Sequence, residues 1–213
     1  MATAIRQNPY SHNWATFAAN TGDHELSVIF DNGDYRHLRM SKPGMLAWHW
    51  EIFTAPGYLA FVGDIGVQLI FRRTTDMLGF FNTRNYGDIY GDGSPFINPG
   101  YWEEKAGPDM QSVTRTFDVD HAVDVVRDAV NELVDCDEVR AEVGDELIAS
   151  ARDAANLEPN AQSFGAWLYE SEHLSALASE AEVEIFHPQF LNTCFALATI
   201  ANRYADYSDE EES

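Results

Sequence analysis

Residues 25–73 decide the fold class, and they read ELSVIFDNGDYRHLRMSKPGMLAWHWEIFTAPGYLAFVGDIGVQLIFRR. Apolar runs of strand length alternate in this stretch with three short turn sequences, DNG at 31–33, PG at 56–57 and GDIG at 63–66. Turns of this composition reverse the chain between neighbouring strands. The stretch therefore predicts an antiparallel β-meander.

The first hairpin has two candidate registers. A three-residue loop at 31–33 pairs Glu25 with Arg39 and Ser27 with His37, and it keeps the apolar side chains on the other side. A two-residue Asn-Gly loop would move His37 and Arg39 to the apolar side, because a slip of one residue turns every side chain over. We therefore expect the three-residue loop.

The next strand is expected at 46–54, where side chains alternate between two sides. The strands expected at 58–62 and 67–71 are apolar at nearly every residue. This pattern is typical of central strands that are covered on both faces, here by the helices that follow. The expected core side of the 46–54 strand carries Leu46, Trp48, Trp50 and Ile52.

The period of the apolar residues changes to the helical value of 3.6 from Asp118 onward. Before that point a short helix is expected at 76–81. The stretch 82–114 is rich in Gly, Pro, Asn and Asp, so we expect it to be a long ordered loop. The helices of the back half are expected at 118–135, 138–156, 163–180 and 188–207.

The expected fold class is α+β, with an N-terminal antiparallel β-meander packed against a C-terminal bundle of about four helices. The chain has 213 residues, which is enough for one large core or two small ones. We expect one structural unit with a β-rich half at 1–115, a helical half at 116–207 and an acidic tail at 208–213.

The composition is strongly acidic, with 35 acidic and 13 basic residues and a formal net charge of −22. This charge repels nucleic acid and anionic membranes, so neither is expected as a direct partner. Two distant cysteines lack the spacing of a zinc site and favour a reducing compartment. The sequence also lacks a signal peptide and a membrane-spanning run, so a cytoplasmic location is expected.

A series of motifs runs through residues 35–81, YRHLRMSKPGMLAWHWEIFTAPGYLAFVGDIGVQLIFRRTTDMLGFF. HLR and KPG precede a Pro-Gly turn before LA, a GDxG turn and a DMxxFF helix. This series resembles a family of uncharacterised bacteriophage and prophage accessory proteins, and INPGYWEEK and FLNTCFALATIANRYADY resemble its closing segments. The resemblance implies a phage-encoded accessory protein of an infected or lysogenic bacterium and supplies no catalytic residues. Ala55 stands where the family usually has Trp.

Positive charge is concentrated in the front half. Six basic and five acidic residues lie between 31 and 84, whereas four arginines stand against 23 acidic residues from 118 to 213. Cations beside aromatic rings are typical of sites for phosphate groups and bases, so a nucleotide-type signalling ligand is one expected partner. The alternative is that the arginines pair with acids and the tryptophans fill the core. The candidate ligand residues are Arg36, His37, Arg39, Lys42, Trp48, Trp50 and Arg72.

A row of acidic side chains lies on the helix expected at 118–135. The four-residue spacing places the carboxylates on one face, about 6 Å apart. Proteins that imitate nucleic acid need such rows, although acidic helix faces are also simply solvated. Our leading hypothesis is a non-enzymatic accessory protein that binds and blocks a host or defence protein through this surface. The candidate partner-binding residues are Asp120, Asp124, Asp128 and Glu132.

Standard catalytic motifs are absent from the sequence, including GxSxG, HExxH, the Walker loop and GxGxxG. His37, His49 and Asp64 would be the residues of a third hypothesis, a small metal-dependent hydrolase. Histidines on a sheet surface are usually plain hydrogen-bonding residues. We therefore assign no catalytic residue, no metal ligand and no cofactor.

Overall fold

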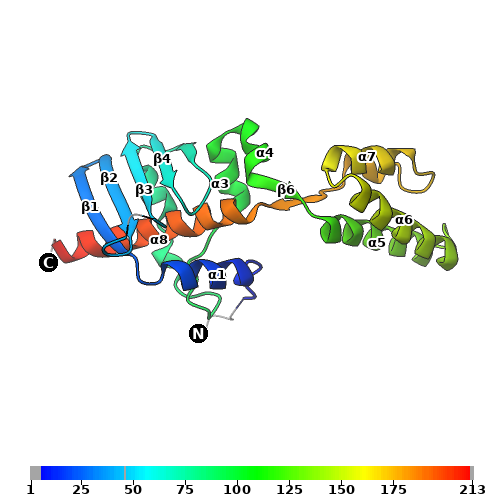
Figure 1. Cartoon of the computed structure of the whole chain (residues 1–213), viewed down its shortest axis with the longest axis horizontal. Helices are drawn as coiled ribbons and strands as arrows, with labels where there is room; N and C mark the ends of the chain where they lie inside the picture. The colour runs from blue at the N-terminus through cyan, green and yellow to red at the C-terminus, as the bar shows by residue number, and fades with distance from the viewer. Residues whose placement is uncertain (1–5, 46, 212–213) are drawn as a thin grey trace. The chain divides into compact units, whose positions relative to one another are not determined.

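The computed structural model describes residues 6–45 and 47–211 (Figure 1). The fold is α+β, with an antiparallel five-stranded sheet in the N-terminal part followed by helices, and at this level the expected class is confirmed. The chain divides into two compact units. The sheet unit comprises 1–114 and 186–213, and the helical unit comprises 115–185. This division differs from the single unit expected.

The sheet is a meander in which each strand pairs with the next one along the chain. Its pairs are all antiparallel, as the alternation of apolar runs and turns predicts. The strands are β1 Glu25–Asn32, β2 Tyr35–Ser41, β3 Trp50–Ala55, β4 Tyr58–Gly63 and β5 Leu69–Arg72.

The register of the first hairpin differs from the prediction. Ser27 lies opposite Arg39, an irregularity follows between Val28 and Phe30, and a two-residue turn at 33–34 joins the strands. The predicted three-residue loop is wrong, and the predicted pairing is wrong by two residues, because a bulge takes up chain that was assigned to the loop. The sides before the bulge are nevertheless right, since side chains alternate with a period of two.

The third strand begins later than predicted, at Trp50. Leu46 lies outside the described residues. Trp48 has a φ of 59°, it is 52% exposed, and its N–H donates to Asp64 Oδ2 (3.1 Å). The alternation therefore fails at Trp48, where the backbone turns, whereas Trp50 and Ile52 reach the core as predicted.

One face of the sheet is buried and the other faces solvent over much of its area. On the outer face, Tyr58 is 45% exposed and Ile70 is 58% exposed. The prediction that the last two strands are covered on both faces is therefore wrong, and β5 is an edge strand. The buried face carries Leu38, Met40, Trp50, Ile52, Leu59, Phe61, Leu69 and Phe71.

The helix α8, Pro188–Glu211, packs against this buried face (Figure 1). Ten of its residues are buried. The sequence places this helix in the helical half, but the structure assigns it to the sheet unit. Its apolar residues extend over more than one side, which suits a helix packed between a sheet and other helices. No helix in the described ranges has the length and apolar character needed to cross a membrane.

Shorter helices complete the sheet unit. The helix predicted at 76–81 is present, with Asp76 as its N-cap. The loop predicted at 82–114 is wrong in part, because it contains an eight-residue helix that begins after Asn98 and has Pro99 in its first turn. The elements are α1 Ser11–Thr21, α2 Met77–Phe81, η1 Arg84–Tyr86, α3 Pro99–Ala106, η2 Pro108–Met110 and α4 Gln111–Thr114.

The helical unit is built from three α-helices and a short 3-10 turn. The predicted helix at 118–135 is confirmed, and Asp118 caps it by accepting from the N–H of His121 (2.8 Å). The predicted helix at 163–180 ends early, at Glu170. The elements are α5 Val119–Asp135, α6 Ala141–Leu157, α7 Ala161–Glu170 and η3 Leu177–Ser179, and the strands β6 Arg115–Phe117 and β7 Glu184–Phe186 pair with each other.

The packing of α8 predicts a large difference between two leucine substitutions. Leu197 is completely buried in the core of the sheet unit, whereas Leu157 at the end of α6 is 84% exposed. Leu197→Ala should lower the free energy of unfolding by about 2–5 kcal/mol, because it leaves a cavity. Leu157→Ala should change it by less than about 0.5 kcal/mol. Urea unfolding followed by circular dichroism measures both, and equal effects would contradict the packing.

Candidate functional site

The seven residues predicted to bind an anion do not converge in the structure. Side chains alternate along β2, so Arg36 points to the buried face while His37 and Arg39 point to the outer face. Trp50 is completely buried. Lys42 and Trp48 belong to the connection between β2 and β3, and Arg72 ends β5.

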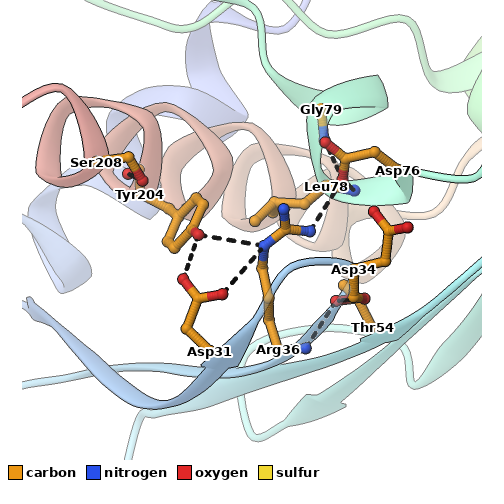
Figure 2. Close-up of polar contacts among 9 residues, drawn as sticks. All are labelled: Asp31, Asp34, Arg36, Thr54, Asp76, Leu78, Gly79, Tyr204 and Ser208. Carbon is orange, nitrogen blue, oxygen red and sulfur yellow. Dashed lines mark hydrogen bonds and ion pairs between the residues drawn. The ribbon is translucent and has the colours of Figure 1, made fainter. Parts of the chain in front are cut away.

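Arg36 is held by three side chains from three different elements (Figure 2). Its Nε donates to the Tyr204 hydroxyl (3.2 Å), and its Nη1 donates to Asp76 Oδ1 (3.0 Å). The Tyr204 hydroxyl in turn donates to Asp31, whose Oδ1 lies 3.9 Å from Nε of Arg36. Only 12% of the Arg36 side chain is exposed. The network therefore joins β1, β2, α2 and α8.

The surroundings of Arg36 favour its charged form. Burial alone would lower the pKa of the guanidinium, but the hydrogen bond with Tyr204 and the charges of Asp76 and Asp31 raise that pKa above its usual value. Arg36 is thus a structural cation whose partners belong to the protein itself. This residue fits the alternative stated for the arginines in the sequence analysis, that they pair with acidic residues of the protein.

Asp76 links the Arg36 network to the start of α2 (Figure 2). Its Oδ1 accepts from the N–H groups of Leu78 (3.1 Å) and Gly79 (3.2 Å) as well as from Arg36. One carboxylate therefore caps the helix and neutralises the buried cation. A side chain at position 79 would crowd this cap, because an added Cβ would lie 2.7 Å from Asp76 Oδ2.

A second cluster of charged groups surrounds Glu51 on the outer face. Glu51 Oε2 lies 2.5 Å from His37 Nε2, and its Oε1 lies 3.4 Å from Arg39 Nε and 3.8 Å from His49 Nε2. Nδ1 of His49 lies 3.2 Å from Asp64 Oδ2. The cluster joins the residues of the hydrolase hypothesis to two of the predicted anion-binding residues, and Glu51 reduces the positive charge that an anion would meet there.

Lys42, another predicted anion-binding residue, is also paired with a carboxylate. Lys42 Nζ contacts the Asp23 carboxylate, and its hydrogen bond lowers the pKa of Asp23. Within residues 6–45 and 47–211, no group of three or more His, Cys, Asp or Glu side chains is arranged to hold a metal ion. Of the predicted ligand cations, Arg72 is thus the one that has no carboxylate partner in the described part of the chain.

Arg72 lines a groove whose cations are Arg72, Arg73 and Lys105, which we call the cationic groove. The groove has a volume of about 600 Å³ and is lined further by Tyr58, Glu104, Ala106 and the backbone of Gly57 and Gly107. Its cations lie against aromatic rings. Arg72 Cζ is 4.8 Å from the centre of the Tyr58 ring, and Arg73 Cζ and Lys105 Nζ are 4.7 and 4.4 Å from that of Tyr101.

The strand register and a helix bring these side chains together. Tyr58 on β4 lies opposite Arg72 on β5, so their side chains share the outer face. β5 ends at Arg72. The next residue, Arg73, no longer follows the alternation of the strand, and its guanidinium lies over the rings of Phe80 and Tyr101. Lys105 is in the last turn of α3, which packs beside β5.

The cationic groove is electrostatically unusual in so acidic a chain. Among the described residues, Arg72 and Arg73 form no ion pair with a carboxylate, and Lys105 pairs with its neighbour Glu104 (3.1 Å). Three cations and one carboxylate therefore line one groove of a protein whose net charge is −22. Such an arrangement is suited to a phosphate group, which guanidinium groups bind through paired hydrogen bonds.

Sequence reasoning missed Arg73 and Lys105. The adjacent basic residues at the end of a predicted strand were a usable signal for Arg73. Lys105 lies in the stretch predicted to be a loop, and its approach to β5 depends on tertiary packing. The sequence pattern therefore contained no sign of this contact.

The acidic row, which comprises Asp120, Asp124, Asp128 and Glu132, lies on the exposed side of α5. The opposite side of α5 is buried through Val123, Val126 and Val130. Two members of the row have arginine partners within the unit: Asp120 Oδ1 accepts from Arg152 Nη1 (2.9 Å), and Asp124 accepts from Arg127. Asp128 and Glu132 form no ion pair among the described residues.

The contrast between Arg36 and Arg72 predicts that the same substitution destabilises the protein at one position and leaves its stability almost unchanged at the other. Arg36→Met should lower the free energy of unfolding by about 1–3 kcal/mol, because it removes the hydrogen bonds to Tyr204 and Asp76 and leaves two partly exposed carboxylates without their cation. The matched change Arg72→Met should alter it by less than about 0.5 kcal/mol. Urea unfolding of the two variants gives both values, and a stable Arg36→Met protein would show that the network is dispensable.

Comparison with known proteins adds no relative: no family model matches the chain, and neither a curated protein nor a solved structure matches it.

Proposed function

We propose that this is a non-enzymatic binding protein that holds a phosphate-bearing small molecule of nucleotide type in the cationic groove. One observation carries the proposal: Arg72, Arg73 and Lys105 line a single groove of about 600 Å³, and the two arginines have no carboxylate partner among the described residues. Pockets for small ligands have volumes of about 300–1,000 Å³. A mononucleotide matches this size.

The lining supplies a group for each part of a nucleotide. The guanidinium groups of Arg72 and Arg73 bind phosphate oxygens, with the charge of Lys105 beside them. Tyr58 is 45% exposed and offers a ring on which a base stacks. Glu104 provides an acceptor for a ribose hydroxyl or a base amino group.

The resemblance to phage accessory proteins supports a role for such binding. A phage protein that captures a signalling nucleotide removes that signal from the host, and it needs no catalytic residue to do so. Capture of this kind requires a dissociation constant no higher than the concentration of the free ligand in the host cell. The groove is suited to tight binding, because its cationic side chains already pack on tyrosine rings and so lose little conformational entropy when a ligand binds.

The test is calorimetric titration with ADP, cyclic di-AMP and inorganic pyrophosphate. Wild-type protein should bind at least one nucleotide, and Arg72→Gln/Arg73→Gln should weaken binding by at least about tenfold, because each charge-assisted hydrogen bond contributes about 1.5–3 kcal/mol. Pyrophosphate alone should bind more weakly than the nucleotide if the base stacks on Tyr58.

The control is Arg84→Gln/Arg152→Gln, which changes the net charge by the same amount at two arginines that do not line the groove. Arg84 pairs with Asp206 and Asp209, and Arg152 pairs with Asp120. This variant should bind like wild type. The proposal fails if wild-type protein binds none of the three probes, or if the control loses affinity as much as the groove variant does.

A second candidate function is favoured by the acidic row. All four carboxylates are exposed, and the side chains of Asp120 and Asp124 are 81% and 59% exposed. A row of this kind offers a partner protein the negative charge that nucleic acid would offer. On this proposal the protein binds and blocks a host or defence protein through α5.

Neutralising the row separates this function from stability. The variant Asp120→Asn/Asp124→Asn/Asp128→Asn/Glu132→Gln removes like-charge pairs that each cost the helix about 0.2–0.5 kcal/mol, so the fold should be retained. A pull-down from a bacterial lysate should lose the partner of the wild-type protein. Recovery of the same partner by the folded variant would reject the acidic row as the contact surface.

A further inference from the structure

The helical unit contains an open hollow of about 380 Å³ beside the last turn of α5. Its other wall is the segment from His173 to Glu180, which includes η3. The floor is apolar. It is formed by Leu133 and Ala129 of α5 and by Leu174, Ala176 and Leu177 of the opposite segment.

The end of α5 shapes one lip of the hollow. Asp137 has a φ of 60°, its N–H donates to the Val134 carbonyl (3.0 Å), and the N–H of Glu138 donates to the Leu133 carbonyl (2.9 Å). These two hydrogen bonds form a Schellman motif, which stops the helix and fixes the direction of the chain. Cys136 and Glu138 are thereby held at the lip by backbone hydrogen bonds.

Three glutamates line the hollow above its apolar floor: Glu132, Glu138 and Glu180. All three are exposed, and none forms an ion pair among the described residues. The whole unit, residues 115–185, contains 18 acidic residues and four arginines. The hollow therefore combines an apolar floor with a strongly negative surround.

We propose that this acidic hollow binds a basic amphipathic segment of a partner protein. An aliphatic side chain of the segment enters the hollow between Leu133, Leu174 and Leu177, while lysines or arginines on either side of it lie against the glutamates. The negative surround repels nucleic acid and anionic membranes, so a cationic polypeptide is the complementary partner. An open hollow also leaves most of a small amine in water, whereas a peptide gains contacts along its length.

Binding in the acidic hollow does not depend on the cationic groove, because the hollow belongs to the helical unit and the groove to the sheet unit. The proposed binding rests on the second candidate function, because Glu132 belongs both to the acidic row and to the lining of the hollow. The second candidate function names only a protein partner of α5, whereas the hollow specifies a basic amphipathic segment and places the contact at the end of this helix. The test must therefore distinguish the hollow from the rest of the row.

The probe is a fluorescent peptide of leucine and lysine with its leucines at helical spacing, and anisotropy measures its binding. Glu132→Gln/Glu180→Gln should weaken binding by at least about tenfold, since both charges border the apolar contact. Asp124→Asn/Asp128→Asn changes the net charge by the same amount on α5, outside the lining of the hollow, and should weaken binding by less than about threefold. A peptide with serine in place of leucine should not bind.

Cys136 provides a second readout, which reports where the peptide binds. This cysteine is exposed and lines the hollow, whereas Cys194 is completely buried. Burial, with the nearby charge of Glu103, raises the pKa of the Cys194 thiol well above its usual value. A maleimide should therefore label Cys136 alone in the folded protein, and bound peptide should slow that labelling.

Several results would overturn the proposal. These are equal weakening by the hollow variant and the row variant, binding of the serine peptide as tight as that of the leucine peptide, and unchanged labelling of Cys136 at saturating peptide. Equal competition by phenylbutylamine would assign the hollow to a small amine instead. Failure of the leucine peptide to bind, together with a pull-down that still depends on the acidic row, would refute the hollow and leave the second candidate function standing.

Discussion

Removal of the inner sheet face from water by α8 is the interaction on which the sheet unit depends. A sheet with one apolar face is not stable until that face is covered, and each fully buried large side chain contributes about 1.5–3 kcal/mol. Ten residues of α8 are buried, against the sheet and against the neighbouring helices. The Arg36 network lies at the polar edge of the same contact, where Tyr204 of α8 binds Asp31 and Arg36, and Arg36 in turn binds Asp76.

The placement of charge follows from the same packing. Arg36 is neutralised because it lies where strand, helix cap and α8 meet, and Arg39 and Lys42 each have a carboxylate beside them. Arg72 and Arg73 lie at the end of an edge strand, where they pack on tyrosine rings rather than on acids. Most of the excess negative charge belongs to the helical unit. A groove lined by three cations and a helix face rich in carboxylates thus occur in different units of one chain.

Local patterns predicted much of the secondary structure. The valine stripe and Asp118 cap located α5, and the turn sequences located the hairpins. Patterns of this kind do not say what covers a helix, so α8 was placed with the wrong partners. They also do not reveal a bulge, which shifted the first register. Arg36 and Arg39 were grouped in one candidate site, yet the alternation of side chains along β2 puts them on opposite faces. Tertiary packing alone brought Lys105 to the groove.

The order of the two units along the chain has a consequence during synthesis. The helical unit, 115–185, is translated before α8, although the sheet that needs α8 is translated first. On the ribosome, the five strands therefore emerge with their apolar face uncovered while the helical unit completes its local contacts. Nascent sheet is a target for chaperones and for aggregation during that interval. The sheet unit is therefore the first to begin translation and the last to have all of its elements available.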